Sequence, residues 1–567
     1  MPTTEKTGFN FIKTEPIARG WSEDKKYCVT KEDGTRYLLR ISPAERYDKR
    51  KALFDLLKKV AALDLPMCRP VEFGTCPAGV YSLQSWIDGA DAEDVIPLMS
   101  DTEQYVYGLK AGTLLKKIHS IPAPETQEPW NIRFNRKIDS KIQCYRQCPI
   151  QYDGGERFVA YLDANRHLLD GRPQSFQHGD YHIGNMMIEN GELTIIDFDR
   201  FDFGDPWEEF NRIVWCAQKS PLFASGMING YFDGKPPQEF WPLLALYITS
   251  NTLSSVSWAI PFGQAEIDTM LNQAKEVLQW YDGMNRVVPA WYFQGYYLQY
   301  ADKIPYKLKT PYDFSFLQKY GQVFKIFDDQ DSGNLCFGTE KDGSRYFIKY
   351  AGAPAEQYSG TPEAAVARLK ATVAAYEDLR HPNLIEFVQA EEIGGGFAMV
   401  FKWADGACMG KMYPQSRQEF LRATQTERLG IFKVILSFHE HAAKKGYVAV
   451  DFYDSSFLYD AAAQKTVICD IDFYAKTPYI NKQGRMWGSS RFMSPEEHRL
   501  GAVIDERTNV YTMGATAFAL FANDRRDRES WTLSEGKYET AAQAVSDARE
   551  NRQQTISRFI EAWEAAE

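Results

Sequence analysis

A short segment of the chain, residues 176–200, places carboxylate and amide side chains at a spacing that suits magnesium and phosphate chemistry. It reads FQHGDYHIGNMMIENGELTIIDFDR and contains Asp180, Asn185 and Asp197. Phosphoryl transfer from Mg·ATP needs a carboxylate that orients the attacking hydroxyl and accepts its proton, oxygen ligands for Mg²⁺ and a cation on the phosphates. Asp180 is the candidate base, and Asn185 and Asp197 are the candidate magnesium ligands.

The residues between Asn185 and Asp197 predict the element that brings these two side chains together. They read MMIENGELTII and contain Asn190-Gly191, a dipeptide typical of a tight β-hairpin turn. A hairpin there places Asn185 and Asp197 side by side. An earlier strand is expected to supply the cation for the phosphates, through Arg40 or Lys349.

The chain repeats part of its own pattern. EDGTRYLLRIS (32–42) is similar to KDGSRYFIKYA (341–351), and SWIDGAD (85–91) is similar to KWADGAC (402–408). The members of the first pair read as hairpin strands with an Asp-Gly turn, and Arg40 and Lys349 occupy the same place in them. Two matches in the same order and at nearly the same offset indicate two domains of one fold.

The second copy has its own acidic segments, GYVAVDFYDSSFLYD (446–460) and TVICDIDFYAK (466–476). We match Asp451 with Asp180, and Asp472 with Asp197. The first copy carries additional residues before Asp180.

A polar, proline-bearing segment near residues 301–314 marks the joint between the copies. The predicted domains are therefore residues 8–300 and 316–567, with residues 301–315 as a linker. The insertion of the first copy includes residues 150–175, and we expect it to shape the acceptor site together with the helices after residue 210.

The first copy resembles the aminoglycoside phosphotransferase and choline kinase family, whose members are relatives of the protein kinases. HGDYHIGN (178–185), IDFD (196–199) and FGDPWEEF (203–210) carry the resemblance. It implies an enzyme that phosphorylates a small alcohol, with ATP or GTP and Mg²⁺ as cofactors. By this resemblance Asp180 is the catalytic base, and Asn185 and Asp197 bind magnesium.

One position departs from that family, because Arg40 stands where the strand lysine is usual. Arginine keeps the charge and can hold phosphates through two hydrogen bonds, with a different geometry. The carboxylate expected to pair with this cation from the next helix is either Asp55 or Glu45, and the sequence does not decide between them.

The second copy resembles the protein serine/threonine kinases. The resemblance rests on YFIK with Lys349, LRHPNLIEF (379–387), Asp451, Asp472-Phe473 and GSSRFMSPEE (488–497), which contains Ser494-Pro495-Glu496. It implies that Lys349 contacts the phosphates, Asp451 is the base and Asp472 binds metal. It also implies a pair between Glu496 and Arg552.

Several positions of the second copy depart from the kinase pattern. The magnesium asparagine is replaced by Ser456, although Asp454 could substitute, and the catalytic-loop lysine is replaced by Tyr453. Thr372 stands where the helix glutamate is usual. The phosphate-covering loop, residues 328–338, is poor in glycine and carries three aspartates, which would repel phosphates unless they point outward.

These departures leave three interpretations open for the whole chain. The second domain is a protein kinase with a protein substrate, or a pseudokinase that regulates the first domain or binds a partner protein. Alternatively, the first domain is a small-molecule sensor that controls a working protein kinase.

We expect three residues in or near the acidic segment to take no part in catalysis. We expect His178 to be structural and Asp205 to cap a helix that starts at Pro206. Asp199 alternates with Asp197 along the predicted strand, so we expect it to face outward.

The composition narrows the classes of function. The chain has 567 residues, 44% of them hydrophobic and 25% charged, with a net charge of −11. This charge does not favour nucleic acid or an anionic membrane as a partner, and it would suit a cationic acceptor alcohol. Its nine cysteines lack the spacing of a zinc site, so we expect reduced thiols and a cytoplasmic location. The predicted fold class is α+β, with two tandem bilobal protein-kinase-like domains.

Overall fold

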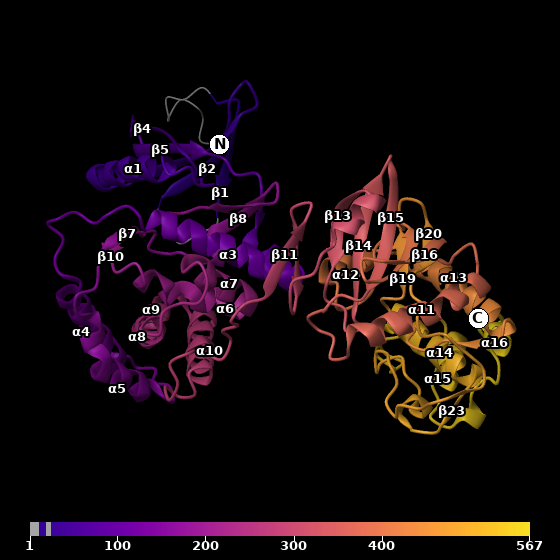
Figure 1. The fold of residues 1–567 in the computed structure, drawn as a ribbon. Coiled ribbons are helices and arrows are strands. Elements are labelled where there is room, and N and C mark those ends of the chain that lie inside the picture. The colour runs from indigo at the N-terminus through magenta and orange to yellow at the C-terminus, as the bar shows by residue number, and fades with distance from the viewer. Residues whose placement is uncertain (1–10, 19–23, 567) are drawn as a thin grey trace. The chain divides into compact units, whose positions relative to one another are not determined.

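The computed structural model describes residues 11–18 and 24–566 of the chain. By its internal contacts the chain divides into two compact units, which Figure 1 shows as a ribbon. Their bounds are Met1–Pro97 with Glu103–Gly295, and Leu98–Thr102 with Tyr296–Glu567. Helices and sheets occur in both, so the predicted mixed α and β content is confirmed.

The first unit begins with a five-stranded antiparallel sheet in the order β1-β2-β3-β5-β4. Helix α1 (Tyr47–Ala61) connects β3 to β4 and packs on β4 and β5 through side chains spaced three or four residues apart: Leu53, Phe54, Leu57 and Val60. The strands are β1 (Lys13–Ile17), β2 (Lys25–Thr30), β3 (Arg36–Ser42), β4 (Pro70–Cys76) and β5 (Gly79–Ser85).

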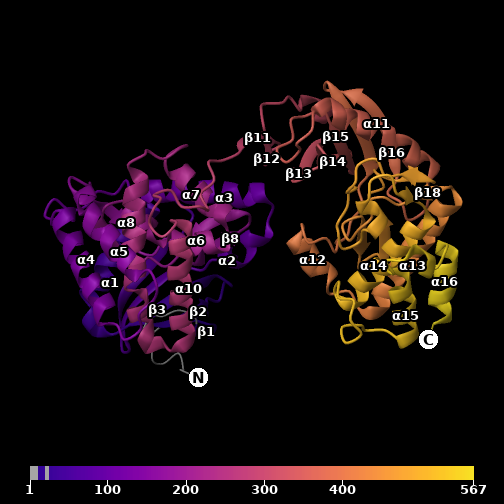
Figure 2. The same cartoon turned by 90° about the horizontal axis from the view of Figure 1, so that it is seen from below.

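The remainder of the first unit is mainly helical, and helices α4, α5 and α8 pack together (Figure 2). This part also contains a small sheet in the order β6-β8-β9 and the strand pair β10-β7. These strands are β6 (Ala90–Asp91), β7 (Ser175–Gln177), β8 (Met186–Glu189), β9 (Glu192–Ile195) and β10 (Asp202–Gly204). The helices are α2 (Ala92–Val95), α3 (Asp101–Ile118), α4 (Trp130–Gln147), α5 (Gly155–Asn165), α6 (Ile213–Lys219), α7 (Pro221–Tyr231), α8 (Phe240–Leu253), α9 (Ser255–Ala259) and α10 (Gln264–Trp280).

Helix α8 is the centre of this helical part. Twelve of its fourteen residues are buried, including Tyr247, whose hydroxyl bonds to Asp205. The stretch Phe240–Phe262 is long and apolar enough to cross a membrane by composition, but 67% of it is buried inside the protein. An apolar helix that is enclosed by its own domain is a core helix.

The second unit contains a sheet with the same arrangement, in the order β13-β14-β15-β17-β16. Helix α11 (Pro362–Asp378) connects β15 to β16, as α1 connects β3 to β4. Asp342 and Gly343 form the turn between β14 and β15 with positive φ angles of 51° and 72°. The strands are β13 (Gln322–Phe327), β14 (Asn334–Lys341), β15 (Ser344–Ala351), β16 (Phe387–Ile393) and β17 (Gly396–Lys402).

Helices and short strands follow the second sheet. The longer elements are α12 (Pro414–Phe420), α13 (Gln425–Lys444), β19 (Phe457–Asp460), β20 (Lys465–Ile468), α14 (Glu506–Ala522), α15 (Glu535–Ala544) and α16 (Ile556–Ala565). The predicted pair is present: Arg552 donates to both oxygens of Glu496, at 2.7 and 3.0 Å, and both residues are buried. This ion pair connects the segment Pro495–His498 with the residues just before α16.

The segment predicted as a linker, residues 301–315, is instead an ordered part of the second unit. Strands β11 (Tyr297–Ala301) and β12 (Ile304–Leu308) form a hairpin. Tyr306 and Leu308 are buried in the core of the second unit, which begins at Tyr296. The sequence did not reveal this strand because β12 lacks the alternation of a half-buried strand: Tyr306, Lys307 and Leu308 are all buried.

Candidate active site

The hairpin predicted between Asn185 and Asp197 is present. Strand β8 (Met186–Glu189) pairs with β9 (Glu192–Ile195), and the turn residues Asn190 and Gly191 have φ angles of 51° and 77°. The Ile196 N–H donates to the Asn185 carbonyl at 3.1 Å, which extends the pairing to the open end. Asn185 and Asp197 therefore leave the same end of one hairpin.

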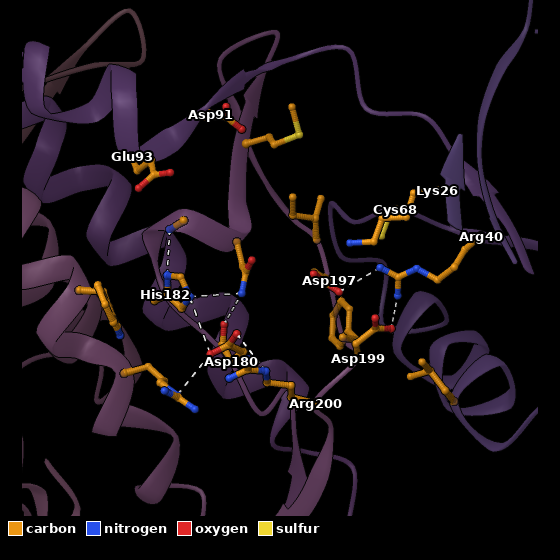
Figure 3. Close-up of a pocket in the computed structure, with 18 of the residues that line it drawn as sticks. Lys26, Arg40, Cys68, Asp91, Glu93, Asp180, His182, Asp197, Asp199 and Arg200 are labelled. Atoms are coloured by element: carbon orange, nitrogen blue, oxygen red, sulfur yellow. Dashed lines mark hydrogen bonds and ion pairs between the residues drawn. The ribbon is translucent and has the colours of Figure 1, made fainter. Parts of the chain in front are cut away.

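A cavity of about 1060 Å³ in the first unit brings the predicted site residues together. Asp180, Asn185, Asp197 and Arg40 all line it, although Arg40 comes from the sheet and the other three from the helical part. Figure 3 shows Asp180 and Asp197 on the same side of this space, with Arg40 beside Asp197. The tertiary structure thus supports a single site for these four residues.

Asp180 lies among cationic and hydrogen-bonding groups. Arg212 Nε is 3.2 Å from its carboxylate, Arg200 Nε is 3.7 Å away and His182 Nε2 is 3.8 Å away. Burial opposes ionisation of Asp180, but the hydrogen bond from His182 and the charges of Arg212 and Arg200 outweigh it and lower the pKa of this carboxyl. Asp180 is therefore ionised at neutral pH.

Asn185 is positioned by the backbone of the same loop. Its Nδ2 donates to the Asp180 carbonyl at 2.8 Å, which fixes the orientation of the amide. Within the described chain, its Oδ1 accepts no hydrogen bond, so this oxygen is the atom that remains for a cation.

Arg40 is a buried cation that faces three carboxylates. Its guanidinium pairs with Asp199, lies 3.4 Å from Asp197 and lies 3.7 Å from Asp24. Burial opposes its charge, but Asp199, Asp197 and Asp24 raise the pKa of Arg40 above its usual value. The pKa of Asp197 is lowered: Arg40 and Lys26 outweigh the effect of burial. The predicted cation is therefore charged and next to the predicted magnesium ligand.

The helix carboxylate expected to pair with Arg40 is absent from the described site. Asp55 forms a surface pair with Lys51, and Glu45 is exposed before α1. Helix α1 instead places Arg50 in the site, where it pairs with Asp24 and with Asp199 at 3.0 Å. Both alternatives for this position were wrong, because the helix supplies a second cation and the carboxylates come from elsewhere.

Asp199 faces inward, contrary to the expectation. Strand β9 ends at Ile195, and Asp197 has a φ angle of 63°, so the alternation of a strand does not continue to Asp199. Its side chain is 18% exposed and lies between Arg40 and Arg50. Asp199 thus takes the place in which the helix carboxylate was expected.

The structural role expected for His178 agrees with the structure, whereas the interpretation of Asp205 holds only in part, because the helix that follows is a 3₁₀ helix that begins at Glu208 and not at Pro206. His178 is fully buried, its Nε2 lies 2.9 Å from the Ile196 carbonyl and its ring packs on Phe198. Asp205 accepts a hydrogen bond from the Trp207 N–H at 3.0 Å. Asp205 also forms a buried pair with Arg172 that the sequence did not predict.

The acceptor end of the cavity is built by helices that are distant in sequence. As expected, helices after residue 210 contribute, through Trp215, Asn251, Thr269 and Gln273 among others. The insertion 150–175 contributes no lining residue within the described chain. Lys141, from α4, also lines the cavity. No motif in the sequence marks this residue, because its role depends on helix packing alone.

The second unit has an equivalent hairpin, and its register corrects one assignment. Phe457 pairs with Ile468 as Met186 pairs with Ile195, and the Cys469 N–H donates to the Ser456 carbonyl at 2.9 Å. Counted from the strand end, the equivalent of Asp197 is Asp470, and the equivalent of Asp199 is Asp472. The match of Asp472 with Asp197 was wrong, because the loop of this hairpin, residues 461–464, is longer than Asn190-Gly191.

Lys349, like Arg40, is bound by two aspartates of the segment that follows the hairpin. Its Nζ bonds to Asp470 at 2.9 Å and to Asp472 at 2.8 Å. Helix α11 contributes no carboxylate: Thr372 bonds to the carbonyl of its own helix, and Tyr376 donates to Asp472 at 2.8 Å. In both units, the second aspartate of an Asp-x-Asp sequence therefore binds the strand cation.

Asp451 has an environment opposite to that of Asp180. The structure gives its side chain no ion pair within residues 24–566, and its charged neighbours are Asp470, Asp331 and Asp472. Burial and then these carboxylates raise the pKa of Asp451 well above its usual value.

The remaining predicted ligands of the second unit have structural partners. Ser456 is fully buried, and its hydroxyl accepts from the Tyr453 N–H at 3.2 Å. Asp454, the possible substitute, accepts a hydrogen bond from Arg491 at 2.8 Å. Of the acidic loop, Asp329 pairs with Lys307, and Asp328 accepts from the Lys307 N–H.

Residues 13–241 match the family model described as APH, phosphotransferase enzyme family. No curated protein matches the chain.

Solved structures with a similar fold share little sequence with the chain. An apo thermostable mutant of aminoglycoside phosphotransferase APH(4)-Ia is 15% identical over 47% of this chain and 94% of that chain, with a TM-score of 0.37. A gentamicin–APH(2")-IIa complex is 14% identical over 47% and 92%, with a TM-score of 0.37. A choline/ethanolamine kinase family protein from Mesorhizobium loti is 16% identical over 48% and 90%, with a TM-score of 0.36. By the family match, residues 13–241 are a domain of the phosphotransferase enzyme family.

Proposed function

We propose that the first unit transfers the γ-phosphoryl group of ATP or GTP to a hydroxyl of a small-molecule alcohol. One observation carries this proposal: within a phosphotransferase-family domain, Asp180, Asn185, Asp197 and Arg40 line a single cavity. Solved structures with a similar fold include one with ADP and hygromycin B and one with gentamicin, which are ligands of those proteins.

The donor set fits Mg²⁺. Asn185 Oδ1 and the Asp197 carboxylate are hard oxygen ligands at the end of one hairpin, and the described chain has no group of three or more His, Cys, Asp or Glu side chains placed to hold a metal ion. Mg²⁺ in such sites is held by one or two protein oxygens and completed by phosphates and water. When bound, Mg·ATP supplies the phosphoryl group and neutralises its charge.

The side chains of the site then have distinct tasks. The ionised Asp180 accepts a hydrogen bond from the acceptor hydroxyl, which orients the oxygen and takes its proton. Arg212 and Arg200 hold Asp180 in one position and keep it charged. Arg40, with five N–H donors, binds phosphate oxygens, and Asp199 and Arg50 keep its guanidinium in place.

The test of this proposal compares phosphoryl transfer by the full chain and by Asp180→Asn. A panel of neutral, cationic and anionic alcohols is incubated with Mg·ATP or Mg·GTP, and phosphorylated products are detected by mass spectrometry. We expect product from at least one alcohol and a loss of about 10³-fold in rate with Asp180→Asn. Nucleotide binding without transfer to any alcohol would contradict the proposal.

For the second unit, we infer a kinase-like module that does not catalyse phosphoryl transfer and instead regulates the first unit or binds a protein partner. The environment of Asp451 supports this interpretation, because burial and neighbouring carboxylates favour the protonated form of this carboxyl, and a carboxyl that already carries a proton cannot accept one from a hydroxyl. Ser456, with its buried and engaged hydroxyl, also supports it.

A tyrosine side chain supplies the second argument. Tyr413 bonds to Gln330 of the acidic loop at 2.9 Å and packs edge-on against Phe327. Burial, and the thiols of Cys336, Cys408 and Cys469, raise its pKa. In the sheet of the second unit Cys336 pairs with Lys349 on the neighbouring strand, and in the sheet of the first unit Lys26 pairs with Arg40 in the same way.

The three cysteines occupy positions equivalent to residues that line the open cavity of the first unit. By the hairpin pairings, Cys336, Cys408 and Cys469 correspond to Lys26, Asp91 and Ile196. Tyr413 is therefore near positions of the second unit whose equivalents line the cavity of the first unit. We expect its ring to hinder the binding of a nucleotide there.

The test uses an Asp180→Asn background, in which the first unit is inactive. We expect no incorporation of phosphate into the chain, and we expect Tyr413→Ala to increase the affinity of the second unit for a fluorescent ATP analogue about tenfold, because a buried ring is removed. Phosphate incorporation that is lost with Asp451→Asn would contradict the inference and support a working protein kinase.

A further inference from the structure

Lys141, on α4, is an unpaired cation in the cavity of the first unit. It lines the same cavity as Asp180, and within the described chain it makes no ion pair or hydrogen bond. A lysine that lines a cavity without a partner is costly, because the ammonium loses water and gains no counter-charge. This arrangement indicates that a ligand supplies the missing negative charge.

The charged groups around Lys141 include further cations, which favour the binding of an anion at this position. Burial, Lys137 and Arg212 lower the pKa of Lys141 to about 7, while Glu208 acts in the opposite direction. The carboxylate of Glu208 does not serve as the partner, because it bonds to Lys137 at 2.9 Å and to Gln177 at 3.2 Å. The local field is therefore positive.

Arg212 connects this positive region to the reaction centre. It lines the cavity, lies 3.2 Å from Asp180 and is close enough to Lys141 to lower its pKa. A molecule whose hydroxyl reaches Asp180 can therefore place an anionic group between Arg212 and Lys141. Two carboxylates line this part of the cavity: Glu93 lies 3.6 Å from Lys219, and Glu266 is half-buried at the start of α10. Neither is among the groups whose charge acts on Lys141.

The rest of this end of the cavity suits a hydroxylated ligand. It is lined by amide and hydroxyl side chains from α8, α9, α10 and the residue between α8 and α9: Asn251, Ser254, Ser255, Thr269 and Gln273. The indole of Trp215 lies beside them. Convergent polar groups and an aromatic face are typical of a site for polyols and sugars.

We propose that the acceptor is a polyhydroxylated molecule that carries a carboxylate or a phosphate, and that Lys141 and Arg212 bind this anionic group. The proposal rests on the proposed function of the first unit and names its substrate class. It differs from the cationic acceptor that the acidic composition suggested, because the net charge of the chain does not describe the charge of this cavity.

The test is a binding measurement with four linear six-carbon probes that differ at one end. Sorbitol is neutral, gluconate carries a carboxylate, sorbitol 6-phosphate carries a phosphate and glucamine carries an amine. Calorimetry is done with a saturating non-hydrolysable ATP analogue and Mg²⁺, so that the phosphate site at Arg40 is filled. We expect one or both anionic probes to bind roughly tenfold or more tightly than sorbitol or glucamine.

The variant Lys141→Met tests the residue, and Arg146→Met is its matched control. Arg146 is on the same helix, carries the same charge, is exposed and does not line the cavity. We expect Lys141→Met to remove the preference for the anionic probes and leave the affinity for sorbitol within about twofold. Arg146→Met is expected to bind all four probes like the unmodified chain.

The outcomes separate this proposal from the proposed function. Equal affinity for all four probes, or an anion preference that persists in Lys141→Met, would overturn the anionic acceptor even if transfer to another alcohol is observed. Anion binding that depends on Lys141, without transfer to any alcohol, would uphold the anion site and overturn the phosphotransfer proposal. A preference for gluconate over sorbitol 6-phosphate, or the reverse, identifies the anionic group.

Discussion

The two units place an aspartate at the same position after the same kind of loop, and they give it opposite electrostatic surroundings. Asp180 lies beside Arg212, Arg200 and His182, and its pKa is lowered. Asp451 lies among carboxylates, and its pKa is raised. The difference shows that a sequence motif places a carboxylate but does not set its protonation, because the deciding charges come from other elements.

The strand cations, in contrast, have similar surroundings in the two units. Arg40 and Lys349 are both buried, and each pairs with the second aspartate of an Asp-x-Asp sequence. Both units therefore hold the strand cation by a carboxylate, and they differ in the surroundings of the aspartate at the position of the base. This contrast is consistent with one site that performs chemistry and one that retains the framework alone.

The largest expected effect is on phosphoryl transfer. Asp180→Asn removes the group that orients the hydroxyl and accepts its proton, so transfer to the acceptor should fall about 10³-fold. Asp451→Asn should leave that rate within about twofold, since the second unit takes no part in the chemistry. The rate is measured by product formation at saturating Mg·ATP. A comparable loss in both variants would break the contrast between the units.

The next largest effect concerns the free energy of unfolding. Each unit contains a buried ion pair, and breaking it should destabilise that unit. Arg552→Met removes the partner that binds both oxygens of the fully buried Glu496, which keeps only the Thr508 hydroxyl at 2.8 Å and Arg549 at 3.5 Å, and this should cost about 3 kcal/mol in the second unit. Arg172→Met should cost less, about 1–2 kcal/mol, because the Arg172 side chain is 17% exposed and Asp205 keeps its hydrogen bonds from the Tyr247 hydroxyl and the Trp207 N–H.

Hydrogen exchange read by mass spectrometry separates these two effects, because α14 reports on the second unit and α8 on the first. Each variant should accelerate exchange in its own unit. If Arg552→Met accelerated exchange in α8 as much as in α14, the two units would not be independent in stability.

A smaller effect concerns thermal stability at pH 7, with opposite signs in the two units. The folded pKa of Asp451 is above its unfolded value of about 3.9, so its ionisation destabilises the folded state as pH rises, and Asp451→Asn should raise the melting temperature of the second unit by about 2 °C. The folded pKa of Asp180 is below that value, so the stability it contributes is present at pH 7 and is lost as the solution is acidified.

Asp180→Asn should accordingly lower the melting temperature of the first unit at pH 7. The difference for Asp451→Asn should shrink as pH falls toward about 4, the unfolded pKa of an aspartate, whereas the difference for Asp180→Asn should persist down to about pH 4 and shrink only below it, because the folded pKa of Asp180 is lower than the unfolded one. Calorimetric scans from pH 4 to pH 8 measure this. A shift of the same sign in both variants at pH 7 would show that the two aspartates have similar surroundings.

The smallest effect is the pH dependence of ligand binding at Lys141. Because its pKa is about 7 in the free protein, Lys141 loses its proton as pH rises, and the affinity for gluconate should fall by about threefold to tenfold between pH 7 and pH 9. The charged and titratable groups that act on Lys141 are Lys137, Glu208, Arg212 and Cys144, and Glu266 also lines the cavity. Sorbitol affinity should stay constant, and an equal decline for sorbitol would assign the change to another group.

The sequence by itself determined those features that depend on neighbours along the chain. Asn190-Gly191 specifies a turn with positive φ angles, and this turn brings Asn185 and Asp197 together. The repeated Asp-Gly hairpins predicted the strand cations Arg40 and Lys349. The pair between Glu496 and Arg552 followed from a family resemblance.

Only the tertiary structure decided which charges meet. Arg50 replaces the expected helix carboxylate, and Asp199 turns inward because Asp197 adopts a left-handed backbone conformation. Asp470 takes the position assigned to Asp472 because a hairpin loop is longer. Lys141 reaches the cavity through the packing of α4. Electrostatic interactions act through space between elements that are distant in sequence, so local patterns cannot predict them.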